Sequence, residues 1–162
     1  MKILQISKFE PTYQGGIEKL VKELSNNLSQ QSIQNDILCF GENKKSQVIV
    51  KGKQKIYICR TLFSFFSAPV SLSIFFYLKK ILHDYDIIHI HLPNPILAFY
   101  LRFIKLENHK ITIHFHADVS RKLGYFLYRY YESFLLRNAL KIIVTTHSLY
   151  QIETLKKYKI KF

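Results

Sequence analysis

Short runs with the character of buried strands alternate with longer segments of helical periodicity along this chain of 162 residues. Parallel strands need a crossover between them, and a helix is the usual crossover, so this alternation is typical of a parallel sheet. We therefore expect an α/β fold with a doubly wound, mostly parallel, Rossmann-like sheet. The expected strands are residues 2–7, 36–40, 55–59, 87–91, 110–114 and 141–145.

The helical segments are recognised by apolar residues that recur every three or four positions. In the first of them Ile17, Val21, Leu24 and Leu28 share one face, which predicts an amphipathic helix ending near residue 31. Segment 41–52 is polar and rich in lysine, and we expect it to form a surface turn. The other expected helices end near residue 83, cover residues 96–106 and 122–137, and run from the last strand to about residue 158.

Residues 61–78 carry no charge and reach the lower limit of length for a bilayer span. Four serines and Pro69 interrupt the segment, and a proline in its middle would break a spanning helix. We therefore expect a loop that leads into a buried helix.

The composition bounds the domain organisation and the partners. With 48% hydrophobic residues the chain can bury its own core, so we expect residues 1–162 to form one domain. The net charge of +13 favours anionic partners such as phosphate groups, nucleic acid or an acidic membrane. The chain has two cysteines, Cys39 and Cys59, which are too few for a disulfide scaffold. Its first apolar run ends at Ile6 and is too short for the core of a signal peptide. We expect buried thiols and a cytoplasmic protein.

Ligands of doubly wound sheets bind beyond the carboxyl ends of the strands. Residues 15–16, 91–94, 116–118 and 145–148 would follow strand ends and meet at one edge. Gly15 and Gly16 would stand where a helix begins, and without a Cβ atom they would let an anion approach the backbone N–H groups. Glycine pairs are also common in ordinary turns, which is the alternative interpretation.

Two histidine doublets lie on neighbouring expected strands, and each doublet projects to one face because its members are two residues apart. Four imidazoles near one edge suggest zinc, but buried strand histidines are commonly hydrogen-bonded core residues, and we expect no metal. His91 and His116, the outermost members, are candidates for ligand contact. The doublets are His89 with His91 and His114 with His116.

Two charged residues follow the second doublet. Asp118 could accept hydrogen bonds from sugar hydroxyls, and Arg121 offers a cation for a pyrophosphate or an acidic acceptor. The alternative is a solvated helix start.

The helix expected over 122–137 mixes tyrosine and phenylalanine with arginine, which suits an anionic membrane surface on its outer face and core packing on its inner face. The sequence contains no nucleic-acid-binding pattern, and we expect no nucleic-acid partner.

The order and spacing of these motifs resemble the N-terminal domain of family four glycosyltransferases of the GT-B type along essentially the whole chain. The branch that the chain resembles adds mannosyl, rhamnosyl or similar hexosyl units in bacterial polysaccharide or lipid-linked glycan synthesis. The segments that carry the resemblance are Gly15-Gly16-Ile17-Glu18-Lys19, the run from Asp86 to Pro95, the run from Ile113 to Val119 and the run from Asn138 to Thr145.

The resemblance implies an enzyme that transfers a hexosyl unit from a nucleotide sugar, its co-substrate, to a glycan or lipid-linked acceptor. Transfer would proceed with retention and without a metal or other cofactor, in the cytoplasm or at the inner face of the cell membrane. Gly15 and Gly16 would approach the donor diphosphate, and His116 would lie at the reacting sugar. His91, Asn94, Asp118 and Arg121 would line the acceptor side.

Two departures from the family pattern follow. The family's C-terminal donor-binding domain is absent from this sequence, so we expect this chain alone to be inactive and a separate C-terminal chain to be a possible partner. Thr146-His147-Ser148 also replaces the usual motif after the last strand. The alternatives left open are a basic membrane- or nucleic-acid-binding α/β module without catalysis and a metal hydrolase.

Overall fold

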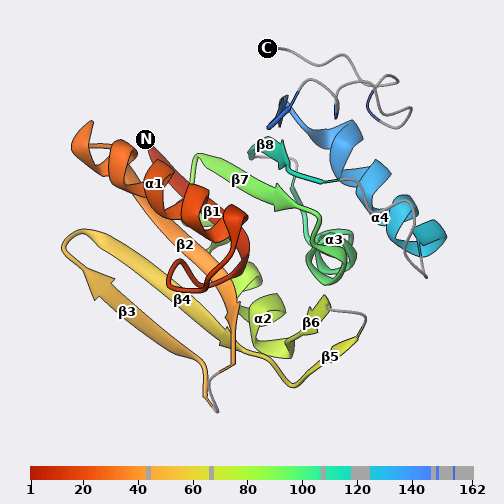
Figure 1. The fold of residues 1–162 in the computed structure, drawn as a ribbon, viewed down its shortest axis with the longest axis horizontal. Helices are drawn as coiled ribbons and strands as arrows, with labels where there is room; N and C mark the ends of the chain where they lie inside the picture. The colour runs from red at the N-terminus through yellow and green to blue at the C-terminus, as the bar shows by residue number, and fades with distance from the viewer. Residues whose placement is uncertain are drawn as a thin grey trace.

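The computed structural model describes residues 1–42, 45–65, 68–106, 109–117, 125–146, 149 and 155. Within them a seven-stranded sheet has the order β3-β4-β2-β1-β7-β8-β9, and β5 and β6 form a separate hairpin (Figure 1). The strands are β1 Lys2–Phe9, β2 Gln34–Gly41, β3 Gln47–Lys51, β4 Gln54–Arg60, β5 Phe63–Phe65, β6 Ala68–Val70, β7 Ile87–Leu92, β8 Lys110–Phe115 and β9 Lys141–Val144. The helices are α1 Gly16–Gln30, α2 Leu72–Ile81, the 3-10 turn η1 Leu82–Asp84, α3 Pro95–Leu101 and α4 Tyr125–Asn138.

All neighbouring strands of the large sheet are parallel except β3, which pairs with β4 in the antiparallel sense. The strand order reverses direction between β1 and β7, since β2 and β4 lie on one side of β1 and β7 to β9 on the other. This is the topology of a doubly wound sheet, and the crevice beyond the carboxyl ends of β1 and β7 is its expected ligand position. The predicted fold class is confirmed.

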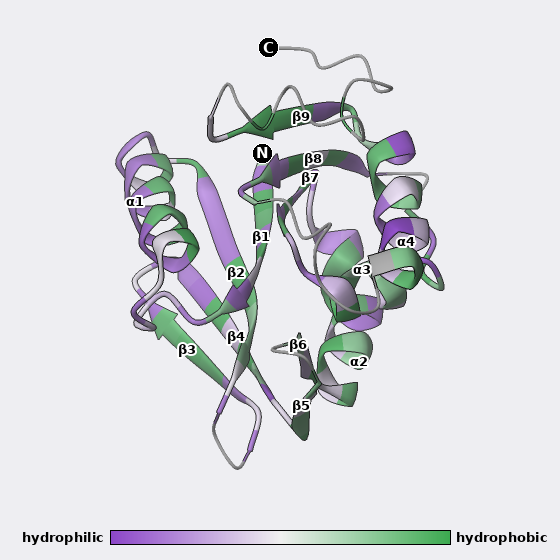
Figure 2. Ribbon diagram, turned by 45° about the vertical axis from the view of Figure 1, so that its right-hand side comes forward, coloured by the Kyte–Doolittle hydropathy of each residue, from purple (hydrophilic) through white to green (hydrophobic). Residues whose placement is uncertain are grey.

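Helices cover the sheet on both faces, with α1 on one side and α2, α3 and α4 on the other (Figure 2). Strands buried on both faces read as nearly continuous apolar runs, which is why the strands were recognisable in the sequence. Below α1, Val21 packs with residues of β2 and β4. The larger core, on the other face, contains Leu4, Ile6, Ile88 and Ile90 together with residues of α2, α3 and α4.

The two cysteines fit the expectation of buried thiols. Cys39 and Cys59 are free and 0% exposed. Burial raises the pKa of Cys59 to about 12, so its thiol is protonated at neutral pH.

Segment 41–52 was predicted to be a surface turn, and this prediction is wrong. It contains the edge strand β3, which returns into β4 through Gly52, a glycine with the positive φ of 59°. Lysines at both ends hid the short alternation of Val48 and Val50, whose side chains are 42% and 63% exposed. Such lysines are common at a sheet edge, where they discourage pairing with another chain.

The uncharged segment 61–78 contains more structure than the expected loop. The hairpin of β5 and β6 comes first, and α2 follows with Ile74, Leu78 and Ile81 buried. Among the described residues, no helix has the combination of length and apolar character that a membrane span requires.

The ends of two other predicted helices differ from expectation. The helix expected over 96–106 is α3, which ends at Leu101, while α4 ends at Asn138, close to its predicted end. Most of the helix expected to reach residue 158 lies outside the described residues; Leu149 and Leu155 are helical.

Candidate active site

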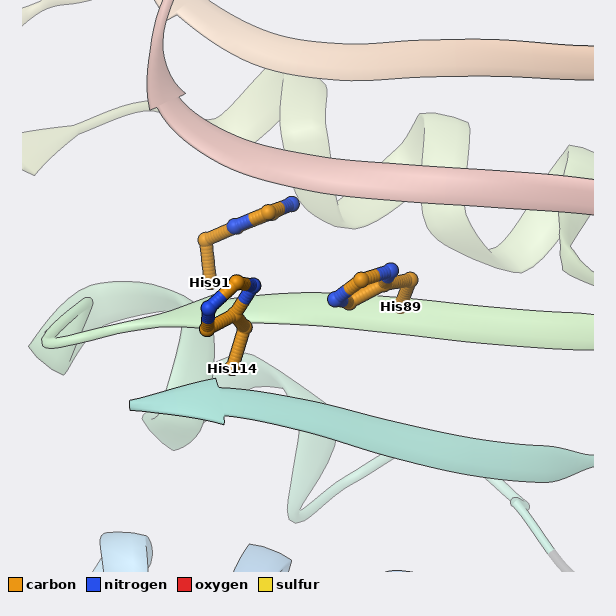
Figure 3. Close-up of side chains that lie close together, drawn as sticks. All are labelled: His89, His91 and His114. Carbon is orange, nitrogen blue, oxygen red and sulfur yellow. The ribbon is translucent and has the colours of Figure 1, made fainter. Parts of the chain in front are cut away.

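Four histidines stack along β7 and β8, and the last of them directly follows the carboxyl end of β8. We call His89, His91, His114 and His116 the histidine ladder. The parallel register places His91 beside His114, so both doublets project from the same face of the sheet, and the three buried rings lie on one side of β7 and β8 (Figure 3). The ring centroids are 4.6 Å apart for His89 and His91, 5.3 Å for His91 and His116 and 4.2 Å for His114 and His116.

The ladder lies on the α1 face of the sheet. Gln5 of β1 is in register with His89, so its side chain projects to the same face, and its Nε2 atom donates to the Ser25 Oγ atom of α1 at 2.7 Å. The Oε1 atom of Gln5 lies 3.3 Å from the Nε2 atom of His91. The Nδ1 atom of His91 lies 3.0 Å from the Nε2 atom of His116. Hydrogen bonds therefore connect α1 with the last residue of the ladder.

Burial keeps the ladder neutral. Loss of solvation lowers the pKa of His89 to about 3 and that of His116 to about 4, and neighbouring histidines add to both shifts. Burial also lowers the pKa of His91 and His114. At neutral pH each ring therefore carries one proton, so each can both donate and accept a hydrogen bond.

Three members of the ladder, His89, His91 and His114, are the described residues whose nitrogen atoms lie close enough to consider a metal, all within 4.8 Å of one another. A metal must lie in the plane of each ring that binds it. The three rings are instead stacked, with interplanar angles of 14° to 30°, and both nitrogen atoms of His91 are already hydrogen-bonded. Binding would require these rings to rotate and His91 to lose a hydrogen bond. Of the three, His91 is a hydrogen-bonded core histidine, whereas the Nε2 atom of His89 and the Nδ1 atom of His114 have no hydrogen-bond partner among the described residues.

Gly15 and Gly16 begin α1 at the carboxyl end of β1. Since β1 and β8 are both parallel to β7, these glycines and His116 lie at the same edge of the sheet. A Cβ atom on Gly15 would collide with the Oε2 atom of Glu18, whereas a Cβ atom on Gly16 would meet nothing within 4 Å. Glu18 belongs to the first turn of α1, is 5% exposed and places its carboxylate beside Gly15, where backbone N–H groups favour negative charge.

Asn94 has a defined structural role. It is the N-cap of α3, and its Oδ1 atom accepts a hydrogen bond from the Leu97 N–H at 3.3 Å. The residue is 0% exposed, and its Nδ2 atom has no hydrogen-bond partner among the described residues. Asn94 thus offers one buried donor beside the strand end.

The structure brings together part of the predicted site. His91 and His116 are in direct contact, and Gly15, Gly16 and Asn94 follow the carboxyl ends of neighbouring strands. Asp118 and Arg121, like His147 and Ser148, lie outside the described residues. Sequence reasoning missed Gln5 and Glu18; the signal for Gln5 was an amide side chain in the middle of an otherwise apolar strand.

Comparisons with known proteins agree on one family. Residues 14–160 match the family described as Glycosyltransferase Family 4. O-antigen chain mannosyltransferase C of Escherichia coli is 26% identical over 164 residues, which cover 99% of this chain and 44% of that protein. D-rhamnosyltransferase WbpZ of Pseudomonas aeruginosa is 23% identical over 149 residues, which cover 91% of this chain and 39% of that protein.

Among solved structures, a sucrose-phosphate synthase from Thermosynechococcus elongatus has the same fold, with a TM-score of 0.66 and 16% identity. The match covers 99% of this chain and 46% of that chain. A shorter chain of the same enzyme gives a TM-score of 0.66 at 15% identity and is covered to 84%. The chain thus spans less than half the length of the curated relatives that it matches.

Proposed function

The chain belongs to glycosyltransferase family 4, and we propose that it is the acceptor-side domain of an enzyme that transfers a hexosyl unit from a nucleotide sugar to a glycan or lipid-linked acceptor. The mannosyl- and rhamnosyltransferase relatives support a hexosyl unit and a polysaccharide product. The observation that carries the proposal is the position of His116. It directly follows the carboxyl end of β8, and its Nε2 atom is within hydrogen-bond distance of the buried His91 ring.

The proposed roles follow from chemistry at this edge. A neutral imidazole at His116 can exchange a hydrogen bond with a hydroxyl of the reacting sugar without bringing a charge. The backbone N–H groups at the start of α1 favour negative charge by about 0.3–1 kcal/mol for each dipole contribution, and we propose that the leaving diphosphate takes the place that the Glu18 carboxylate occupies beside Gly15. We propose that transfer occurs with retention and without a metal, and that Asn94, Asp118 and Arg121 contribute to the acceptor side.

Most of the nucleotide-sugar contacts in this proposal belong to a second, donor-binding domain. The relatives are more than twice as long as the part that this chain matches. Both domains must hold the two substrates in line for the transition state to be stabilised, so residues 1–162 alone should give no measurable transfer.

The test is a fusion of residues 1–162 to the C-terminal part of the E. coli mannosyltransferase, assayed with a set of nucleotide sugars and lipid-linked acceptors. The fusion should transfer sugar, and His116→Ala should reduce kcat by about 100-fold while the fold is retained. His83→Ala is the matched control, because the His83 side chain is 74% exposed and precedes β7 at the opposite edge. Equal losses in the two variants, or full activity of His116→Ala, would contradict the role of His116.

We further propose that the domain binds the anionic face of a membrane, where lipid-linked acceptors would be found. Aromatic and aliphatic side chains are exposed on the helical face opposite α1, and basic residues lie among them. The Nζ atom of Lys79 lies 4.6 Å from the centroid of the Phe75 ring, and the Cζ atom of Arg102 lies 4.9 Å from the centroid of the Phe134 ring. Such a mixture suits the headgroup region of acidic bilayers. Exposed residues of this face include Phe76 64%, Phe103 60%, Phe126 91%, Leu127 66% and Tyr130 61%, and the β5 strand adds Phe63 60% and Phe65 62%.

A further inference from the structure

We propose that Gln5 is a positioning residue that acts through His91 and fixes His116 in the tautomer with its proton on Nε2, so that a bare Nδ1 atom faces the sugar. The use of that atom on a sugar rests on the proposed function. The assignment of the tautomer does not, because it follows from a chain of hydrogen bonds whose direction is set at its buried end.

The direction begins at Asn35. Its side-chain Nδ2 atom lies 3.2 Å from the Ser25 carbonyl oxygen and 3.4 Å from that of Ile33. Carbonyl oxygens only accept, so the atom that faces them must be the amide nitrogen. The Oδ1 atom of Asn35 therefore points to the other side, where it accepts from the Nε2 atom of Gln54 at 2.8 Å.

Asn35 in turn orients Gln5. One terminal atom of the Gln5 amide lies 3.4 Å from the Oδ1 atom of Asn35. Two amide oxygens would repel each other there, so this atom is Nε2, which also donates to Ser25. The Oε1 atom of Gln5 is thereby left to face His91. Gln5 is 0% exposed, and no rotation of its amide satisfies Asn35 and reverses this direction.

Gln5 determines the proton positions of both histidines. Its Oε1 atom only accepts, so the Nε2 atom of His91 must carry the proton that lies between them. Neutral His91 then has a bare Nδ1 atom, which accepts from the Nε2 atom of His116 at 3.0 Å. Neutral His116 in turn has a bare Nδ1 atom, and none of the described residues donates a hydrogen bond to it.

This tautomer determines which substrate groups can form a hydrogen bond with His116. The Nδ1 atom of His116 can accept a hydrogen bond from a hydroxyl group, and it cannot donate one to an ether or carbonyl oxygen. The ladder thus selects a substrate group that carries a hydrogen, and it does so without ionising any histidine. Loss of the acceptor at Gln5 would free His91 to take its other tautomer, and His116 would then be free to follow.

Nitrogen-15 NMR of the histidine rings of residues 1–162 near neutral pH tests the assignment directly, since long-range proton–nitrogen correlations distinguish the two tautomers. Both His91 and His116 should show the pattern of a proton on Nε2. A proton on Nδ1 of His116 in the unaltered protein would overturn the proposal. This measurement needs no substrate and no second domain, so its outcome is independent of whether sugar transfer is found.

Three variants test the role of Gln5. Gln5→Met removes the acceptor at similar volume, and His91→Phe removes both nitrogen atoms from the middle of the chain. In both, the single Nε2–H pattern of His116 should be lost. The control is His89→Phe, a buried residue of the same strand whose Nε2 atom has no hydrogen-bond partner among the described residues, and it should leave the pattern unchanged. An unchanged pattern in a folded Gln5→Met protein would show that Gln5 only fills space.

Discussion

The Nδ1 atom of His91 lies 3.0 Å from the Nε2 atom of His116, although the two residues are 25 positions apart in the chain. The contact exists because β7 and β8 are parallel neighbours in register, and both rings project from the α1 face. It joins a residue that is 1% exposed to one at the open edge of the sheet. A half-buried histidine is thus hydrogen-bonded to the buried polar network around Gln5, and several measurable properties depend on this contact.

Stability should decrease as the pH falls below about 6.5. The pKa of His89 is about 3 and that of His116 about 4 in the folded chain, both below the ordinary value of 6.5. Between these values the unfolded chain binds more protons, so acid favours unfolding, on the order of 1.4 kcal/mol for each pH unit and each histidine. Urea unfolding at pH 7 and pH 5 should show the loss. His89→Phe, which removes one titrating ring, should have a smaller difference between the two pH values; a difference equal to that of the unaltered protein would contradict the assignment.

Replacing Asn94 should weaken the start of α3. Asn94→Ala removes the acceptor for the Leu97 N–H, and loss of such a cap costs about 1 kcal/mol in the free energy of unfolding. Asn94→Ser keeps an acceptor at this position and should recover a large part of the loss. Urea denaturation of the two variants provides the comparison. Equal stability of the alanine variant and the unaltered protein would show that the cap contributes nothing.

The two glycines at the start of α1 should respond differently to alanine. Gly16→Ala meets open space and should leave stability unchanged or raise it by about 0.4–1 kcal/mol. Gly15→Ala displaces the end of the buried Glu18 side chain and should lower stability by at most about 1 kcal/mol. Adding Glu18→Ala should remove that penalty, so a double-mutant cycle measured by thermal unfolding should be non-additive. Additive effects would place the cost of Gly15→Ala elsewhere.

Binding to anionic vesicles should depend on the aromatic side chains of the helical face. Phe126→Ser and Phe103→Ser should each weaken association with phosphatidylserine vesicles, by about tenfold if roughly 1.4 kcal/mol of apolar burial is lost. Val50→Ser is the matched control, because Val50 is 63% exposed on the edge strand β3, away from the helices. Vesicle co-sedimentation at two salt concentrations measures both the apolar and the electrostatic contribution. Similar losses in all three variants would argue against a specific membrane face.

Local sequence patterns predicted the fold well where each strand is buried on both faces. β1, β2, β4, β7 and β8 were all found, because buried parallel strands need apolar side chains in both directions. The edge strand β3 was missed because most of its side chains are exposed, so its sequence is polar and rich in lysine and has no continuous apolar run. The same reasoning missed the hairpin of β5 and β6, whose short strands have no periodicity of their own.

The alternation of strands and helices, the resemblance to the family, and the histidine doublets and paired glycines at strand ends could all be read from the amino-acid sequence, because they depend on spacing along the chain. Which polar atoms are in contact could be seen only in the folded chain. Gln5 and His91 are 86 positions apart, and their hydrogen bond depends on the strand order that places β1 beside β7. The direction of a hydrogen-bond chain, and with it the tautomer of His116, is a property of atoms in contact, and no pattern of residue types encodes it before the sheet is assembled.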